Sequence, residues 1–197
     1  FEVMHFSTYA LADPDCQAGN LDRTKLKVVK IHKEVGEQKV VLKTEFTLPV
    51  NEITNQPDPP INPIAKGFLV SLIDTDSNDP TLWSALAEAG AYDKETKSGW
   101  KSNSKNTAFS YKAKGRADGL KSVVVQTFYH KAPGLVKVKV VANKAAVAID
   151  TAVVQAEISL DPAGYIDHCA RTDFEQPSPT ANGFCASNGS ATALICR

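Results

Sequence analysis

The sequence predicts an all-β protein, a β-sandwich of jelly-roll or immunoglobulin-like type with roughly eight to ten strands, one short helix and two disulfides. Short β-branched segments in which apolar and polar residues alternate recur along the chain, separated by turn-forming residues. The 197 residues, 43% of them hydrophobic, suit one domain with a substantial core. The four cysteines form no Cys-x-x-Cys motif, so disulfides are favoured over a zinc ribbon or a thioredoxin-like redox site.

The chain is expected to divide into an N-terminal arm over residues 1–24 and a single sandwich domain over residues 25–197. The arm has no sustained hydrophobic period, and its first nine residues, FEVMHFSTY, are compatible with a short strand. Such a strand either adds to the sheet of its own chain or exchanges into a neighbouring subunit. The second arrangement predicts self-association through the arm into a homopolymeric assembly.

Two strands at 25–32 and 38–48, joined by a turn at Gly36, are expected to open the sandwich. The second alternates apolar and polar residues, the period of a half-buried strand. Four prolines then make 51–67 a stiff loop, because proline donates no backbone hydrogen bond to a sheet and disfavours helix before it. A strand is expected to resume at 67–73.

The helix is expected over residues 82–93. Asp79 and Pro80 stand where an N-cap and a first helical turn belong, and Gly90 is a stop signal. Four apolar residues of the segment share one helical face: Leu82, Ala85, Leu86 and Ala89.

The second half of the chain is expected to be β-rich after a polar segment at 94–106. Two short strands are expected near the C-terminus, at 165–169 and 191–196, on either side of a loop. Four further strands are indicated by alternation or β-branched residues: 107–113, 120–131, 134–142 and 151–160.

Formal charge cancels, with 22 basic and 22 acidic residues and no block of lysine or arginine. We therefore expect neither a nucleic-acid partner nor insertion into a membrane. Acidic residues gather in loops such as 74–79, so a neutral chain is predicted to have two unlike surfaces. Five lysines on predicted strands are interpreted as a solvated face that discourages edge pairing: Lys112, Lys114, Lys121, Lys137 and Lys139.

The favoured cysteine pairing joins Cys185 to Cys196 and Cys16 to Cys169, and two other pairings remain open. Disulfides indicate an oxidising compartment. No run approaches the ~18 apolar residues of a membrane helix, and the start of the chain is unlike a signal peptide. We expect a soluble secreted, periplasmic or cell-surface protein whose export signal has been removed. Four free thiols in a cytosolic protein are the alternative.

Several short patterns follow one another between residues 99 and 174: GW before a polar stretch, AFSYKAK, GLKSVVV, LVKVKVVANKAAVAI and a closing strand with Cys and Phe. In this order they resemble a β-sandwich module that recurs in exported proteins of environmental bacteria. The chain lacks the second cysteine often found in the central strands of that module, and the segment after Phe174 is unmatched. The resemblance implies an extracellular or periplasmic sandwich of unassigned activity, without catalytic residues.

A possible cation site follows the strand at 67–73, where oxygen donors alternate as in a Ca²⁺-binding loop: Asp74, Asp76, Asn78 and Asp79. Asp79 occupies the position of the EF-hand glycine, and Ala85 that of its bidentate glutamate, so any affinity for Ca²⁺ is expected to be low. The alternative is a solvated turn in which Asp79 caps the predicted helix.

Aromatic residues cluster between positions 83 and 111 and predict a stacking platform for a carbohydrate: Trp83, Tyr92, Trp100, Phe109 and Tyr111. The alternative is that the two tryptophans close the open end of the sandwich core.

No catalytic residue is assigned. The chain has no Gly-x-Ser-x-Gly or His-Glu-x-x-His motif, and its four histidines are scattered. His168 pairs with Cys169 only if that thiol is free, and Glu45 and Glu157 are carboxylates on strands that nothing singles out. The leading hypothesis is a non-enzymatic extracellular or surface module acting by structural assembly or protein interaction. The alternatives are a carbohydrate-binding module and an uncharacterised hydrolase.

Overall fold

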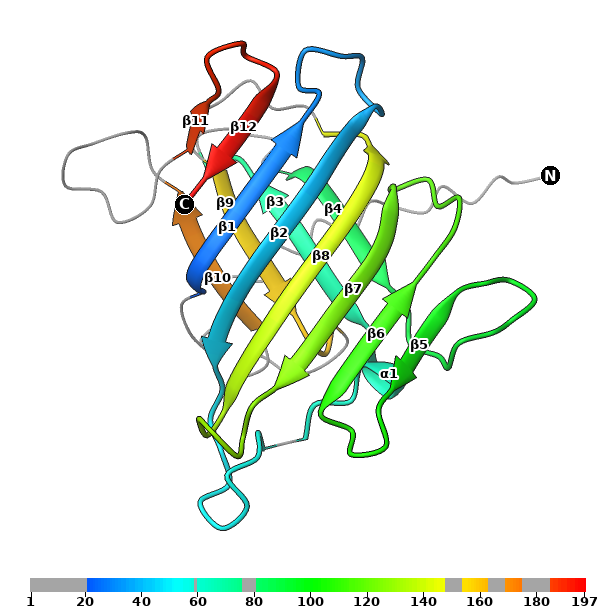
Figure 1. Cartoon of the computed structure of the whole chain (residues 1–197), viewed down its shortest axis with the longest axis vertical. Helices are drawn as coiled ribbons and strands as arrows, with labels where there is room; N and C mark the ends of the chain where they lie inside the picture. The colour runs from blue at the N-terminus through cyan, green and yellow to red at the C-terminus, as the bar shows by residue number, and fades with distance from the viewer. Residues whose placement is uncertain (1–20, 59, 76–80, 148–153, 163–168, 175–184) are drawn as a thin grey trace, which may run out of the picture.

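Two antiparallel sheets pack face to face in the computed structural model, which describes residues 21–58, 60–75, 81–147, 154–162, 169–174 and 185–197 (Figure 1). The large sheet has eight strands: β11 (Cys185–Ser187), β12 (Ala193–Cys196), β1 (Asp22–Val29), β2 (Gln38–Thr47), β8 (Leu135–Ala145), β7 (Leu120–Thr127), β6 (Ala108–Lys112) and β5 (Gly99–Ser102), in that spatial order. The small sheet has four: β10 (Cys169–Phe174), β9 (Val154–Ser159), β3 (Phe68–Ile73) and β4 (Thr81–Ala87). The predicted β-sandwich is confirmed.

The core lies between the sheets because apolar residues occupy every second position of the strands. In β2, Val40, Leu42 and Phe46 are fully buried, while Lys39 and Lys43, at the alternate positions, are exposed. Side chains of β3 meet them from the small sheet, with three buried at 0% exposure: Phe68, Val70 and Leu72. The period-two prediction for this part of the chain is therefore correct in detail.

The prediction of a helix over residues 82–93 is wrong, because this segment contains β4. Trp83, Ala85 and Ala87 face the core, whereas Leu86 is 40% exposed. The sequence carries both a helical and a period-two pattern here. Pairing with β3 satisfies the backbone of β4 and buries the large indole of Trp83 at the same time, and this favours the strand.

The short helix is instead α1 (Pro63–Lys66), inside the segment predicted as a proline-rich loop. The side chain of Asn62 accepts a hydrogen bond from the Ala65 amide, and Pro63 occupies the first turn, where its missing N–H is not needed. Gly67, at φ 81°, ends the helix and donates its amide to the Pro63 carbonyl.

Other boundaries also differ from expectation. β1 begins at Asp22, with Leu21 already in the core, so the sandwich starts within the predicted arm. The polar segment at 94–106 contains β5, and β11 was not expected. β10 runs over Cys169–Phe174, so it begins at the last residue of the strand expected at 165–169, and residues 165–168 lie outside the described residues. Residues 1–20, the strand proposed within them and the self-association assigned to the arm lie outside the described residues.

The predicted Cys185–Cys196 disulfide is confirmed and joins directly opposite residues of β11 and β12. It is the one disulfide with both cysteines in the described part of the chain. Cys16 lies outside that part, so the predicted Cys16–Cys169 bridge and the total of two disulfides stay predictions, although Cys169 is not a free thiol. Among the described residues no helix is long and apolar enough to cross a membrane.

Candidate basic interaction face

The outer surface of the large sheet carries a cluster of cations on the neighbouring strands β1, β2 and β8, which Figure 1 shows side by side. Each of these side chains alternates with a buried residue such as Leu26, Leu42 or Val138, and therefore points away from the core. We call this set the basic face: Arg23, Lys25, Lys27, Lys39, Lys43, Lys137 and Lys139.

Three lysines of the basic face lie in one row across the sheet. Lys43 of β2 is directly opposite Lys25 of β1 on one side and Lys139 of β8 on the other. Directly opposite side chains in antiparallel strands have Cβ atoms about 5 Å apart, and like charges there are destabilising. Among the described residues no carboxylate forms an ion pair with any of the three. We call this set the lysine row.

The neighbouring row is compensated. Glu45 of β2 lies opposite Lys137 of β8, with Oε2 of Glu45 2.9 Å from Nζ of Lys137, and its Oε1 is 3.1 Å from Nε of Arg23. The hydrogen bond from Lys137 lowers the pKa of Glu45, and the charge of Arg23 acts in the same direction. Asp22 and Glu45 both lie at the same end of this face. Among the described residues no carboxylate forms an ion pair with the other five lysines of the basic face.

The sequence-based interpretation of the strand lysines as a guard against edge pairing is wrong for Lys137 and Lys139. Both belong to β8, which is paired on one side with β2 and on the other with β7. The edges of the large sheet are β11 and β5. Charges on an interior strand protect no edge, so the lysines of β2 and β8 need another explanation. The other lysines of the basic face were missed as a site, although two sequence patterns indicate them. These are the K-x-K alternation of Lys25 and Lys27 in β1 and the K-x-x-x-K spacing of Lys39 and Lys43 in β2.

A shallow depression of about 310 Å³ lies along the lysine row. Its walls include Lys25, Lys43 and Lys139, with Val124 and Gln126 of β7 on the far side. Glu45 and its two partners, Arg23 and Lys137, line the same depression. Its lining holds no histidine, serine or cysteine, and its cations outnumber its one carboxylate, so it can attract an anion and donate hydrogen bonds to it.

Four of the five aromatic residues predicted as a carbohydrate platform are core residues. Trp83, Trp100 and Tyr111 are 4%, 1% and 3% exposed, and the ring centroids of Trp100 and Tyr111 are 5.2 Å apart. Phe109 is buried with them, and Tyr92 is half-buried under the ammonium group of Lys101. The two tryptophans therefore close the end of the sandwich, which was the alternative interpretation.

The indole N–H groups of this end link the two sheets. Trp83 of β4 donates to the Asp118 carbonyl in the turn between β6 and β7, and Trp100 of β5 donates to the Glu88 carbonyl just after β4, both at 2.9 Å. Two hydrogen bonds thus run in opposite directions between the sheets, and they account for the presence of tryptophan at both positions.

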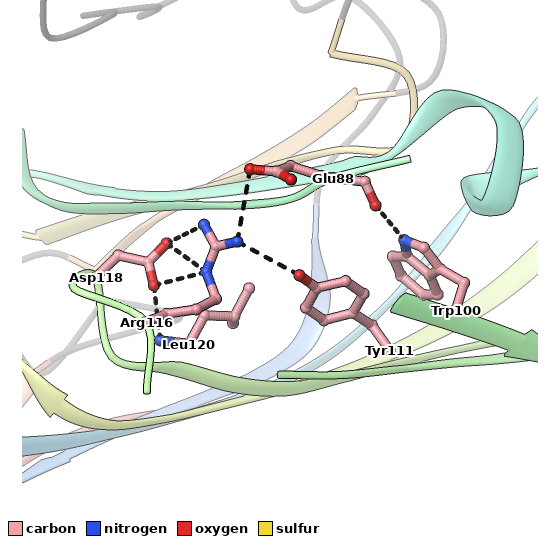
Figure 2. A network of polar contacts seen from close by, with 6 residues as sticks. All are labelled: Glu88, Trp100, Tyr111, Arg116, Asp118 and Leu120. Atoms are coloured by element: carbon pink, nitrogen blue, oxygen red, sulfur yellow. Dashed lines mark hydrogen bonds and ion pairs between the residues drawn. The ribbon is translucent and has the colours of Figure 1, made fainter. Parts of the chain in front are cut away.

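Arg116 completes this end of the molecule, as Figure 2 shows. Its guanidinium binds the Asp118 carboxylate through Nε and Nη2, at 3.0 and 2.7 Å, and lies 3.4 Å from the Tyr111 hydroxyl and 3.7 Å from Glu88. The hydrogen bond to Asp118 raises the pKa of Arg116. With its donors directed at protein groups, Arg116 acts as a clamp on the β6–β7 turn.

The structure describes only one residue of the predicted cation site. Asp74 is buried at 4% exposure, while Asp76, Asn78 and Asp79 lie outside the described residues. Within the described ranges no group of three or more His, Cys, Asp or Glu side chains is placed to hold a metal. The potential Ca²⁺ site therefore stays a prediction.

The two residue pairs considered for catalysis do not form a catalytic site. Glu45 is on β2 of the large sheet and Glu157 on β9 of the small one, each at a position that alternates with core residues, and Glu157 is itself buried at 7% exposure. They cannot act on one substrate bond from opposite faces of a sandwich. Cys169 is not a free thiol, so it cannot pair with a histidine as a nucleophile.

Comparisons with family models, with curated proteins and with solved structures find no match for this chain. The resemblance of residues 99–174 to a module of exported bacterial proteins therefore stays a prediction.

Proposed function

We propose that this protein is a non-enzymatic interaction module that acts outside the cell and binds an anionic partner through the basic face. The observation that carries the proposal is the lysine row, in which Lys25, Lys43 and Lys139 are directly opposite one another on interior strands. Each like-charged pair destabilises a sheet by roughly 0.2–1 kcal/mol. A face that needed only to be solvated is better built with alternating charges, as the adjacent Glu45–Lys137 pair illustrates.

The disulfide supports an extracellular location. Cys185 and Cys196 join two strands at the edge of the large sheet, and disulfides persist in secreted, periplasmic and surface proteins. Assembly through the N-terminal arm depends on residues outside the described part of the chain and is kept as a separate hypothesis.

The test compares two triple variants with the same change of net charge. The first is Lys25→Gln/Lys43→Gln/Lys139→Gln, and the second replaces three exposed lysines of turns, Lys33, Lys94 and Lys131, by glutamine. Binding to immobilised heparin and to polyglutamate is measured at low and at physiological ionic strength.

We expect the wild type to bind at least one polyanion, with an affinity that falls as salt rises. The row variant should lose about tenfold in affinity, or roughly 1.4 kcal/mol, while the turn variant keeps most of it. Failure of the wild type to bind any polyanion at low salt, or equal losses in the two variants, would contradict the proposal.

A further inference from the structure

We propose that the anionic partner is an acidic polysaccharide whose chain lies across the strands of the large sheet. This inference rests on the proposed function and specifies its partner. It starts from the register beyond β8: Lys139 is opposite Val124 of β7, Val124 is opposite Ser110 of β6, and Ser110 is opposite Lys101 of β5. The lysine row therefore continues across six strands and ends on another lysine.

A second row runs parallel to the first, two residues along each strand. It begins at Lys27 of β1, passes over Val41, Val141 and Ser122, and ends at Lys112 of β6. Neither row contains a carboxylate, and each has a serine next to the lysine at its far end, Ser110 beside Lys101 and Ser122 beside Lys112. We call the two rows together the strip. With neighbouring strands about 4.8 Å apart, the six-strand row spans roughly 24 Å.

The composition of the strip favours a polysaccharide over a protein. Protein interfaces are depleted in lysine and depend on aromatic, methionine or arginine anchors at their centre. The two rows contain small half-buried valines and no aromatic side chain. The exposed large apolar residues of the described chain, Val35, Ile53 and Leu86, lie outside them. An acidic polysaccharide is hydrated and extended, and lysine ammonium groups and serine hydroxyls match its sulfates, carboxylates and hydroxyl groups.

Single-stranded nucleic acid is also a weaker match, because its binding sites add aromatic side chains on which the bases stack. The two rows contain none, and the ring of Tyr92 beside their far end is covered by the ammonium group of Lys101. The chain as a whole also carries no net charge. Duplex DNA is held by phosphate contacts alone in some proteins. It is therefore included in the test as a competing ligand.

Glu45 borders the strip on one side. It lies two residues from Lys43 along β2, and Arg23 and Lys137 are bound to it. A polyanion is therefore directed to the two uncompensated rows rather than to the row of Glu45. Replacing Glu45 by glutamine frees two cations next to the lysine row and should raise affinity for the polysaccharide about threefold to tenfold.

The experiment uses the full chain and isothermal titration calorimetry. The ligands are sized heparin oligosaccharides, polygalacturonate as a carboxylated chain without sulfate, polyglutamate, duplex DNA and neutral dextran. Besides the row variant, a far-end variant, Lys101→Gln/Lys112→Gln, removes the cations at the β5–β6 end of the strip. The turn variant at Lys33, Lys94 and Lys131 is the matched control, and thermal unfolding confirms that each variant is folded.

We expect heparin or polygalacturonate to bind more tightly than polyglutamate or DNA, and dextran not to bind. Affinity for heparin fragments should increase with length until a fragment spans the strip. The far-end variant should then weaken binding of long fragments severalfold and leave short fragments, held at the lysine row, unchanged. The Glu45→Gln variant should bind more tightly than the wild type.

Three outcomes overturn the inference. Tighter binding of polyglutamate or DNA assigns a different partner and leaves the proposed function standing. Equal loss of short and long fragments in the far-end variant, or no loss of either, shows that the chain does not cross the strands. Absence of binding to every polyanion removes the inference and the proposed function together.

Discussion

Lys137 of β8 faces Glu45 of β2 directly across the large sheet, with 2.9 Å between Nζ and Oε2. Two residues along the same strands, Lys139 faces Lys43 with no acid between them. The same backbone thus carries a compensated pair and a like-charged pair side by side. The contrast shows that the sheet accepts an acid at such a position, and that the lysine row is a departure from the arrangement that stabilises it best.

The first prediction concerns pH. The pKa of Glu45 is lowered from its ordinary value of 4.5 by Lys137 and Arg23, so the folded state binds its proton less readily than the unfolded state. The stabilisation is present above pH 4.5 and is lost as the pH falls through the lower, folded-state pKa. Wild type should therefore be more stable than Glu45→Gln near neutrality, and the difference in Tm should shrink below pH 4.5.

Thermal unfolding across this pH range checks the prediction. Glu52→Gln, in an exposed loop, is the control for the loss of one carboxylate. A Glu45→Gln variant whose offset from wild type is constant would show that the two ion pairs contribute nothing to stability.

The second prediction separates binding from stability. Lys43→Glu places a carboxylate between Lys25 and Lys139, replacing repulsion on both sides by attraction. It should raise the free energy of unfolding by about 0.2–1 kcal/mol in urea titrations and abolish binding to heparin. Added salt should stabilise the wild type more than the variant, because screening relieves repulsion only in the former. A destabilised Lys43→Glu would argue that the lysine row is part of the packing rather than a binding surface.

The third prediction concerns the Cys185–Cys196 disulfide. It closes a loop with a sequence separation of 11, for which chain entropy predicts a stabilisation of about 3 kcal/mol. The Cys185→Ser/Cys196→Ser variant should lose up to that amount in chemical denaturation. Heparin binding should persist, because β11 and β12 lie beyond β1 and contribute no cation to the strip. Loss of binding in a folded variant would show that the edge strands position the basic face.

The fourth prediction concerns the turn between β7 and β8. Gly134 adopts φ +71°, and a Cβ there would overlap the carbonyl oxygen of Leu48. Gly134→Ala should destabilise the protein by the roughly 1–2 kcal/mol of a left-handed alanine and by a further cost for the overlap. Gly36→Ala is the control, since Gly36 also has a positive φ but has open space around it. Equal losses of Tm in the two variants would show that the overlap is relieved without cost.

Many of the strands were predictable because apolar and polar residues alternate along them. The alternation in β2 and β8 identified both strands and the side of each that faces the core. Residues 82–93 were not predictable in this way, because a segment with Leu82, Ala85 and Leu86 satisfies a helical period and a strand period equally well. The strand is selected by its pairing with β3, which also buries Trp83 in the core.

The basic face was likewise predictable in part. The order of residues is enough to show that lysines alternate with apolar residues on several strands and that the chain is neutral. Lys25, Lys43 and Lys139 become neighbours through the pairing of strands that are distant in the chain, because this pairing sets the register. A shift of one residue in either pairing would turn these side chains toward the other face of the sheet. Packing of the buried faces fixes the register, and the register in turn brings the lysines together on the outer face.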